Sequence, residues 1–217
     1  MRTVLITGAT GGLGTEILPY LTGAYDCVAL YRSESSFAPL RGSARGVQAD
    51  LGDPESVRRA VRSIGTPYAL VHLAGGFAPG TIAETDDALW ANMLSLNLTA
   101  AFVVIREVLA VMDHAAAGRI IVISSEAALT KAAGSAAYTV AKSGLNALIE
   151  VAAKELRGTA ITANALLPAA LDTAAMREVM PREKLVPAGR VGETLAWLLS
   201  DAAANVTGAL IPLRAVP

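Results

Sequence analysis

Tyr138 and Lys142 stand four residues apart in the run SAAYTVAKSGLNALIE, and a phenol and an ammonium at this spacing can act together on a proton. Residues at positions i and i+4 of a helix lie one turn apart on the same face. A free phenol has a pKa of about 10, which is too high for efficient proton exchange near neutrality, and a neighbouring positive charge lowers it. The pair therefore predicts acid–base chemistry, although a solvated surface pair is the commoner meaning of this spacing by itself.

Ser125 lies thirteen residues before Tyr138, in the stretch VISSEAA that follows an apolar run. A hydroxyl in this place can donate a hydrogen bond to the oxygen of a substrate and hold it beside the phenol. Ser124 is adjacent and competes for the same role. The residues alone leave both serines as candidates.

The elements that must position these residues alternate between short apolar runs and longer helical patterns. Seven strands are expected, at Thr3–Thr7, Cys27–Tyr31, Gly46–Ala49, Tyr68–His72, Ile120–Ile123, Ile161–Leu167 and Ala209–Leu213. Helices are expected at Gly12–Leu21, from Asp53, from Asp86 to Ala116, around Tyr138 and from Gly192. This alternation predicts an α/β fold in which a parallel sheet carries helices on both faces. Ligands of such sheets bind beyond the carboxyl ends of the strands.

A glycine-rich loop, TGATGGLG, follows the first strand and opens the first helix. Gly8, Gly12 and Gly14 have the spacing G-x-x-x-G-x-G. Glycines let a backbone approach a pyrophosphate, and a helix N-terminus offers free N–H groups and the positive end of a dipole. The loop predicts a dinucleotide site, and the alternative is a tight turn that binds nothing.

The end of the second strand carries Arg32 and Ser33, and the first acidic residue after it is Glu34. In dinucleotide folds an acid at this tip binds the adenine ribose and favours NAD, whereas an arginine accommodates a 2′-phosphate and favours NADP. Arg32 and Ser33 therefore predict a preference for NADP(H). Asp50, at the end of the third strand, can accept a hydrogen bond from the adenine amine.

Composition narrows the functional classes. The 217 residues carry a net charge of -1, so a nucleic-acid partner is not expected. The single cysteine, Cys27, excludes a disulfide framework. Neither a signal peptide nor an apolar run of about 20 residues is evident, so we expect a cytoplasmic protein without membrane contact. His72 and His114 have no partners at metal-ligand spacing, and no metal is expected.

Six motifs in order resemble those of the short-chain dehydrogenase/reductase family. The matching stretches are TGATGGLG, LAGG at Leu73 to Gly76, SLNLTAAF around Asn97, VISSEAA around Ser125, Y-x-x-x-K at Tyr138, and LLPAALDT at the end of the sixth strand. The resemblance runs from Thr3 to about Leu213. Leu73 stands where the family carries asparagine, Ala169 follows Pro168 where the family has glycine, and the substrate loop at about 169–191 is short.

The resemblance implies one NAD(P)-binding domain over residues 1–217, of the Rossmann-type, doubly wound kind. It implies an oxidoreductase that transfers hydride to or from a small or medium carbonyl or alcohol substrate, with NADP(H) preferred. Tyr138 would be the acid/base, Lys142 would lower its pKa, Ser125 would orient substrate, and Asn97 would hold a water in a proton relay; Asn92 is a nearby competitor. Cofactor contacts are expected from Gly8, Thr10, Gly11, Gly12, Leu13, Gly14, Arg32, Ser33, Asp50, Leu51, Ala74, Gly75, Tyr138, Lys142, Pro168 and Thr173.

Two other functions stay open at this point. The AGGF loop is similar to that of dihydropteridine reductases, which reduce a C=N bond, although Ser125 favours a carbonyl. A sensor that binds dinucleotide without chemistry is a second alternative, although such proteins often lose the serine, tyrosine or lysine. The helices from Asp86 and Gly134 are apolar on more than one face, which predicts a homodimer or homotetramer through them.

Overall fold

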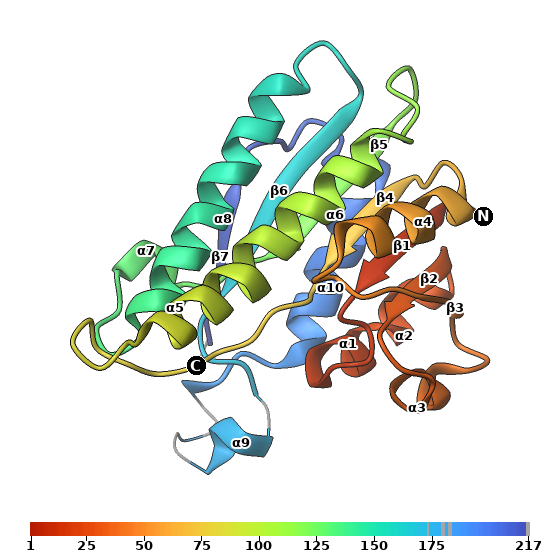
Figure 1. Cartoon of the computed structure of the whole chain (residues 1–217). Coiled ribbons are helices and arrows are strands. Elements are labelled where there is room, and N and C mark those ends of the chain that lie inside the picture. Colours follow the sequence, from red (N-terminus) through yellow and green to blue (C-terminus); the bar gives the residue numbers. More distant parts are fainter. Residues whose placement is uncertain (173, 179–180, 182–183, 216–217) are drawn as a thin grey trace.

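The computed structural model describes residues 1–172, 174–178, 181 and 184–215 of the chain. Seven parallel strands form one sheet in the order β3-β2-β1-β4-β5-β6-β7 (Figure 1). The strands are β1 Thr3–Thr7, β2 Asp26–Tyr31, β3 Arg45–Gln48, β4 Ala69–His72, β5 Gly118–Ile123, β6 Ile161–Pro168 and β7 Leu210–Leu213. The predicted fold is therefore confirmed, with strand bounds that shift by at most two residues.

Helices connect consecutive strands. They are α1 Gly12–Ile17, α2 Pro19–Thr22, α3 Glu34–Phe37, α4 Pro54–Ile64, α5 Asp87–Leu94, α6 Ala100–Leu109, α7 Ala127–Thr130, α8 Ala136–Glu155, α9 Ala174–Arg177 and α10 Ala188–Leu199. The described residues also form two 3-10 turns, η1 Ala38–Leu40 and η4 Asp201–Ala203, and a π-helical turn, η2 Ser95–Thr99.

Alternating side chains of each strand enter two separate hydrophobic layers. Leu5 and Leu70 point to the layer that is closed by α4, α6 and α8. Ile6 and Val71 point to the opposite layer, which is closed by α1, α2 and α10. Because both faces are covered, the strands inside the sheet are mostly apolar, as parallel strands in doubly wound sheets are, whereas the edge strand β3 (RGVQ) is largely exposed.

Two predicted helices differ from the observed ones. The helix expected over Gly12–Leu21 is divided into α1 and α2, because Pro19 has no N–H to continue the backbone ladder. The helix expected to run to Ala116 ends at Leu109, and the turn around Asn97 inside it is π-helical. Single-turn π segments occur frequently at functional sites.

The continuous helix Asp87–Leu109 has the length and composition of a membrane-crossing segment, with a mean hydropathy of 1.7 over its most apolar window. Helices of a protein core share these properties, and this one packs against α4, α8 and the sheet. Its outward face carries the exposed ring of Phe102. The apolar residues of this helix are thus divided between the core and an outer surface.

Candidate active site

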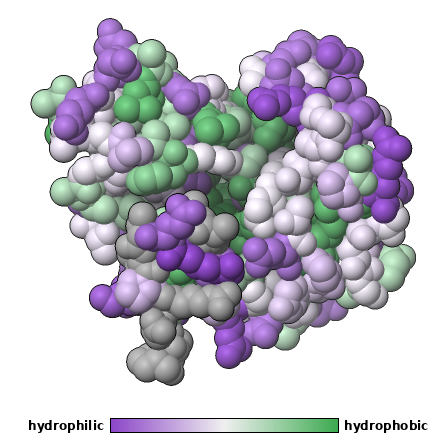
Figure 2. Space-filling view, turned by 90° about the horizontal axis from the view of Figure 1, so that it is seen from below, coloured by the Kyte–Doolittle hydropathy of each residue, from purple (hydrophilic) through white to green (hydrophobic). Residues whose placement is uncertain are grey.

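The carboxyl ends of the strands meet at one edge of the sheet, where most of the expected site residues lie. Figure 2 views the molecule from this edge and shows a hollow between two masses of atoms, with hydrophobic residues visible inside it. The glycine loop after β1, the loops after β2, β4 and β5, and the start of α8 all reach this edge. Thr173 falls outside the described residues, so its expected cofactor contact stays a prediction.

The glycine loop is shaped by close backbone approaches. Gly8 has a φ of +71°, and a Cβ there would lie 2.6 Å from the backbone nitrogen of Ala74. A side chain on Gly14 would collide with the backbone of Gly8 and Ala9. A Cβ on Gly12 would meet nothing within 4 Å. The loop is therefore packed tightly against its neighbours on the inside and is open on the outside, as a backbone cradle for a pyrophosphate must be.

The tip of β2 presents a free guanidinium. Among the described residues Arg32 makes no ion pair, whereas its carbonyl oxygen accepts a hydrogen bond from Gln48 at 3.0 Å. Glu34, the acid nearest to it in sequence, is bound by the Tyr31 hydroxyl and by Arg41, whose Nη2 lies 2.6 Å from the carboxylate. Arg32 is thus available to a ligand anion, and Glu34 is already engaged.

The other residues expected at the adenosine end lie in ordered turns. The Ser33 hydroxyl accepts a hydrogen bond from the backbone N–H of Ser36 and caps α3. The Asp50 carboxylate accepts from the N–H of Gly52 at 2.9 Å, and Asp53 is the cap of α4, as its sequence position suggests. The other carboxylate oxygen of Asp50 makes no hydrogen bond or ion pair with the described residues, and its contact with an adenine amine stays a prediction.

Tyr138 lies at the site edge of α8, half-buried beside Ser125. Burial raises the pKa of the Tyr138 phenol, and a hydrogen-bonding interaction with the Ser125 side chain partly offsets this effect. Lys142 was expected to lower this pKa, but burial outweighs the other influences, so the pKa is raised instead. The phenol is protonated near neutrality, as a free phenol already is, and this is the form that can donate a proton.

Lys142 lies one turn further along α8 and is only 5% exposed. Its Nζ donates a hydrogen bond of 2.9 Å to the carbonyl oxygen of Ile123 and lies 5.9 Å from the centroid of the Tyr138 ring. Burial lowers the pKa of Lys142 to about 8. The ammonium is therefore fixed behind the phenol and is still charged at neutral pH.

Asn97 is fully buried in the π-helical turn η2, and its side chain is occupied by the loop after β4. Its Oδ1 accepts from the N–H of Gly76 at 3.1 Å, and its Nδ2 donates to the Gly76 carbonyl at 3.0 Å and to that of Met93 at 3.2 Å. A Cβ on Gly75 would lie 2.7 Å from Asn97 Oδ1 and 3.3 Å from Lys142 Nζ. The relay role of Asn97 stays a prediction; the structure shows an amide that clamps a backbone.

His72 and Phe77 are two residues at this edge whose roles the sequence did not indicate. His72 is fully buried, with Nδ1 2.9 Å from the Thr7 hydroxyl, and its Nε2 has no partner among the described residues. Burial lowers the pKa of His72 to about 3, and the charge of Lys142 adds to this effect. Phe77 lies against Tyr138. The position of Phe77 directly after Gly75 and Gly76 was the feature of the sequence that could have indicated its place at the site.

Beyond β5 and β6, the expected cofactor residue Pro168 accepts a hydrogen bond from the N–H of Glu126 at 3.0 Å. The Glu126 carboxylate pairs with Arg214, which lies just after β7. The loop that carries Ser125 is thus fastened to the ends of β6 and β7.

A family model described as short chain dehydrogenase matches residues 2–184 of the chain. The chain belongs to this family. A 3-oxoacyl-[acyl-carrier-protein] reductase of Pseudomonas aeruginosa is 31% identical, and the match covers 98% of this chain and 96% of the relative. A granaticin polyketide synthase putative ketoacyl reductase of Streptomyces violaceoruber is 32% identical over 94% of this chain and 88% of its own.

The similarity extends to three dimensions. The crystal structure of a variant of actinorhodin polyketide ketoreductase with NADPH superposes with a TM-score of 0.90 at 27% identity, over 99% of this chain and 96% of that one. This short-chain dehydrogenase is therefore an oxidoreductase with the fold of its family, and a nicotinamide dinucleotide is the family's cofactor.

Proposed function

We propose that this short-chain dehydrogenase reduces the carbonyl group of small or medium-sized ketones and aldehydes with NADP(H) as the preferred cofactor, and oxidises the alcohols in the reverse direction. The observation that carries the proposal is the Tyr138 phenol beside Ser125, with the buried Lys142 ammonium behind it. Two of the relatives above are named as reductases of ketoacyl groups, which supports a ketone as substrate.

In this mechanism the substrate oxygen lies between the hydroxyls of Ser125 and Tyr138 and accepts a hydrogen bond from each. The nicotinamide cofactor, when bound, supplies the hydride. Tyr138 donates its proton to the alkoxide that develops on the substrate oxygen. Lys142 stabilises the phenolate that remains, because its positive charge is buried and is therefore only weakly screened by water.

The geometry fits a dinucleotide along the strand ends. Gly8 to Gly14 would face the pyrophosphate, with Thr10 and Leu13 among them, and Asp50 and Leu51 would lie against the adenine. Ala74, Gly75, Lys142 and Pro168 would surround the nicotinamide end. Arg32 and Ser33 would hold the 2′-phosphate; the free Arg32 guanidinium and the engaged Glu34 carboxylate support the preference for NADP(H).

A panel of carbonyl compounds, followed at the NADPH absorbance band and repeated with NADH, tests the function. We expect turnover of several ketones or aldehydes, and we expect Tyr138→Phe to abolish it while NADPH still binds. Retained turnover in that variant would refute the mechanism. A quinonoid dihydropterin belongs in the panel, since its reduction in the absence of any carbonyl turnover would favour the C=N alternative. Tight NADPH binding without turnover of any compound would favour the sensor.

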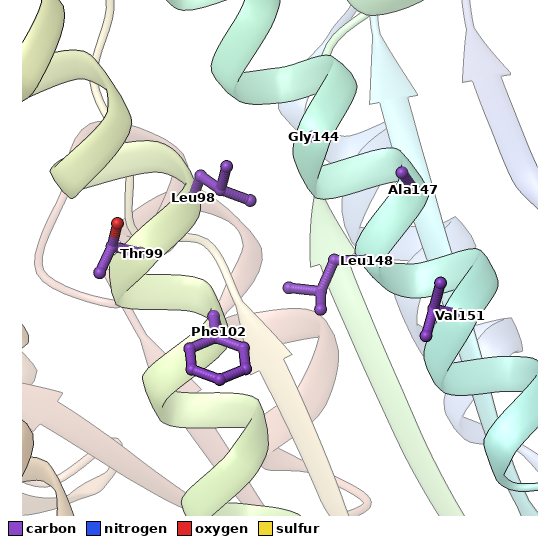
Figure 3. Close-up of a pocket in the computed structure, with 7 residues that line it drawn as sticks. All are labelled: Leu98, Thr99, Phe102, Gly144, Ala147, Leu148 and Val151. Atoms are coloured by element: carbon purple, nitrogen blue, oxygen red, sulfur yellow. The ribbon is translucent and has the colours of Figure 1, made fainter.

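We also propose a homodimer or homotetramer that forms through α6 and α8. A groove of about 410 Å³ lies between these helices and is almost wholly apolar (Figure 3). Leu98 and Leu148 point into it from opposite sides, and Phe102 and Val151 lie at its end. Its lining residues are Leu98, Thr99, Phe102, Gly144, Ala147, Leu148 and Val151. A second copy of the same helix pair is the occupant that we propose for this surface.

A further inference from the structure

Phe77 is an exposed aromatic residue that touches the catalytic phenol. Its ring centroid lies 5.1 Å from that of Tyr138, with an angle of 81° between the two planes. The residue is nevertheless 65% exposed. An edge-to-face pair of this kind is a favourable arrangement, and Tyr138 is the aromatic partner of Phe77 among the described residues. The mechanism above uses Tyr138 but gives Phe77 no role.

The backbone on the N-terminal side of Phe77 is held by Asn97. The side chain of Asn97 binds both the N–H and the carbonyl of Gly76. A Cβ on Gly76 would lie 2.7 Å from the Leu96 side chain, so this residue sits directly against η2. Phe77 thus begins from a backbone position that is fixed by the same turn that carries Asn97.

The C-terminal side of the loop is held by the start of α8. The N–H of Gly80 donates to the carbonyl of Gly134 at 2.8 Å, and the N–H of Ala136 donates to the carbonyl of Gly80 at 2.9 Å. Ala136 lies two residues before Tyr138 on the same helix. The loop from Gly76 to Gly80 is therefore fastened at both ends, to the turn that carries Asn97 and to the helix that carries Tyr138, and it presents an apolar ring at the site without burying it.

We propose that Phe77 and Tyr138 form an aryl subsite, and that this enzyme selects carbonyl compounds with an aromatic or conjugated planar group attached to the carbonyl carbon. The inference rests on the proposed carbonyl reduction at Tyr138. It names the substrate class and makes Phe77 a residue that determines specificity.

The arrangement of the two rings explains the choice of a planar group. Two rings at nearly a right angle form a corner, so a flat group that stacks on one ring meets the other edge-on, and both are preferred aromatic geometries. A carbonyl that is conjugated with an aryl group is coplanar with it. When its oxygen reaches the hydroxyls of Tyr138 and Ser125, its aryl group is held in a defined plane beside them. A saturated ring of the same size is puckered and cannot stack.

The test compares acetophenone with cyclohexyl methyl ketone, which have the same size but differ in planarity. We expect Phe77→Ala to lower the ratio of their kcat/KM values about fivefold, mainly through a higher KM for acetophenone. Phe77→Trp should keep the ratio. The matched control is Ile82→Ala, since Ile82 is 86% exposed on the same connection but lines a separate cavity with Trp90. Using the change of the ratio between variants cancels the intrinsic reactivity of each ketone.

An unchanged ratio in Phe77→Ala, or an equal loss for both ketones, would overturn the inference, and the equal loss would show that Phe77 only supports Tyr138. Absence of any carbonyl turnover in the wild-type enzyme would instead refute the proposed function. In that case, binding of 1-phenylethanol and 1-cyclohexylethanol to the NADPH complex, followed by nucleotide fluorescence, still decides the subsite. Loss of the aryl preference in Phe77→Ala would support it, and an unchanged preference would refute it.

Discussion

Asn97 binds both backbone polar groups of Gly76, with its Oδ1 3.1 Å from the nitrogen and its Nδ2 3.0 Å from the carbonyl oxygen. One side chain thus takes the place of a strand partner for the loop that leaves β4. This amide holds the N-terminal side of the loop and lies directly against Gly75.

Replacing Asn97 with alanine should therefore destabilise the protein and disorder the site. The change removes the partner of the N–H and carbonyl of Gly76, which costs about 1–3 kcal/mol for a fully buried group and falls near the lower value here, because Gly76 is half-buried. We expect a loss of this size in the free energy of urea unfolding, together with a fall in kcat. Asn92→Ala is the matched control, because Asn92 lies on α5 but is exposed. Equal effects of the two substitutions would contradict the clamp.

Replacing Arg32 with alanine should weaken NADPH far more than NADH. A guanidinium that faces a phosphate makes charge-assisted hydrogen bonds, which contribute about 1.5–3 kcal/mol, so roughly a tenfold or larger rise in the Kd of NADPH is expected. Arg41→Ala is the control, since Arg41 is also exposed at this tip but pairs with Glu34. Isothermal titration with both nucleotides measures the effect. Equal losses for NADPH and NADH in Arg32→Ala would refute the 2′-phosphate assignment.

The pH dependence of kcat/KM for NADPH, which reflects ionisations of the free enzyme, should show the loss of the Lys142 proton. Its pKa of about 8 means that the ammonium loses its proton above this pH, and kcat/KM for NADPH should then fall. The pKa of Tyr138 is raised and cannot produce a limb at this pH. Lys142→Arg keeps its charge at all accessible pH values, so its residual activity should lack the limb. A wild-type profile that is flat to pH 10, or a limb that persists in the variant, would contradict this prediction.

Protein stability at mildly acidic pH should depend on His72. The pKa of His72 is about 3 in the folded protein and near 6.5 in an unfolded chain. The folded state therefore binds fewer protons between these values, and stability falls as the pH drops below about 6.5. The contribution at pH 5 is about 2 kcal/mol.

His72→Gln removes this titration while retaining a group that can bind Thr7. The difference in unfolding free energy between pH 7.5 and pH 5 should be about 2 kcal/mol smaller in the variant than in the wild type. Urea titrations at the two pH values measure it. Identical differences in the two proteins would show that His72 does not contribute to acid sensitivity.

The proposed assembly predicts that a charge in the apolar groove separates the subunits. Val151 is 48% exposed at its rim, and Val151→Glu would bury an unpaired carboxylate against a second copy. Light scattering at micromolar concentration should give a dimer or tetramer for the wild type and a smaller species for the variant. Arg59→Glu, at an exposed position on α4, is the control. A monomeric mass for the wild type would refute the proposed assembly.

The sequence predicted the sheet and the place of Tyr138, Lys142 and Ser125, because strand–helix alternation and motif spacing are local properties that a parallel sheet converts into a shared edge. It did not predict the division of the first helix at Leu18 and Pro19, the π-helical turn around Asn97 or the contact of Phe77 with Tyr138. These features depend on tertiary packing between segments that are distant along the chain. The raised pKa of Tyr138 has the same origin, since burial is set by the surrounding fold.

The two fastenings of the Gly76–Gly80 loop have a consequence for how the enzyme can change. Because this loop is already ordered, it loses little conformational freedom when a ligand binds. The selectivity of the site then follows from the shape of the loop and not from its adaptation to the ligand. We expect the preference among carbonyl substrates to change in steps when one side chain is exchanged. An attempt to change the substrate preference of this enzyme would begin with saturation mutagenesis at Phe77, because the backbone there stays in place when the side chain is exchanged.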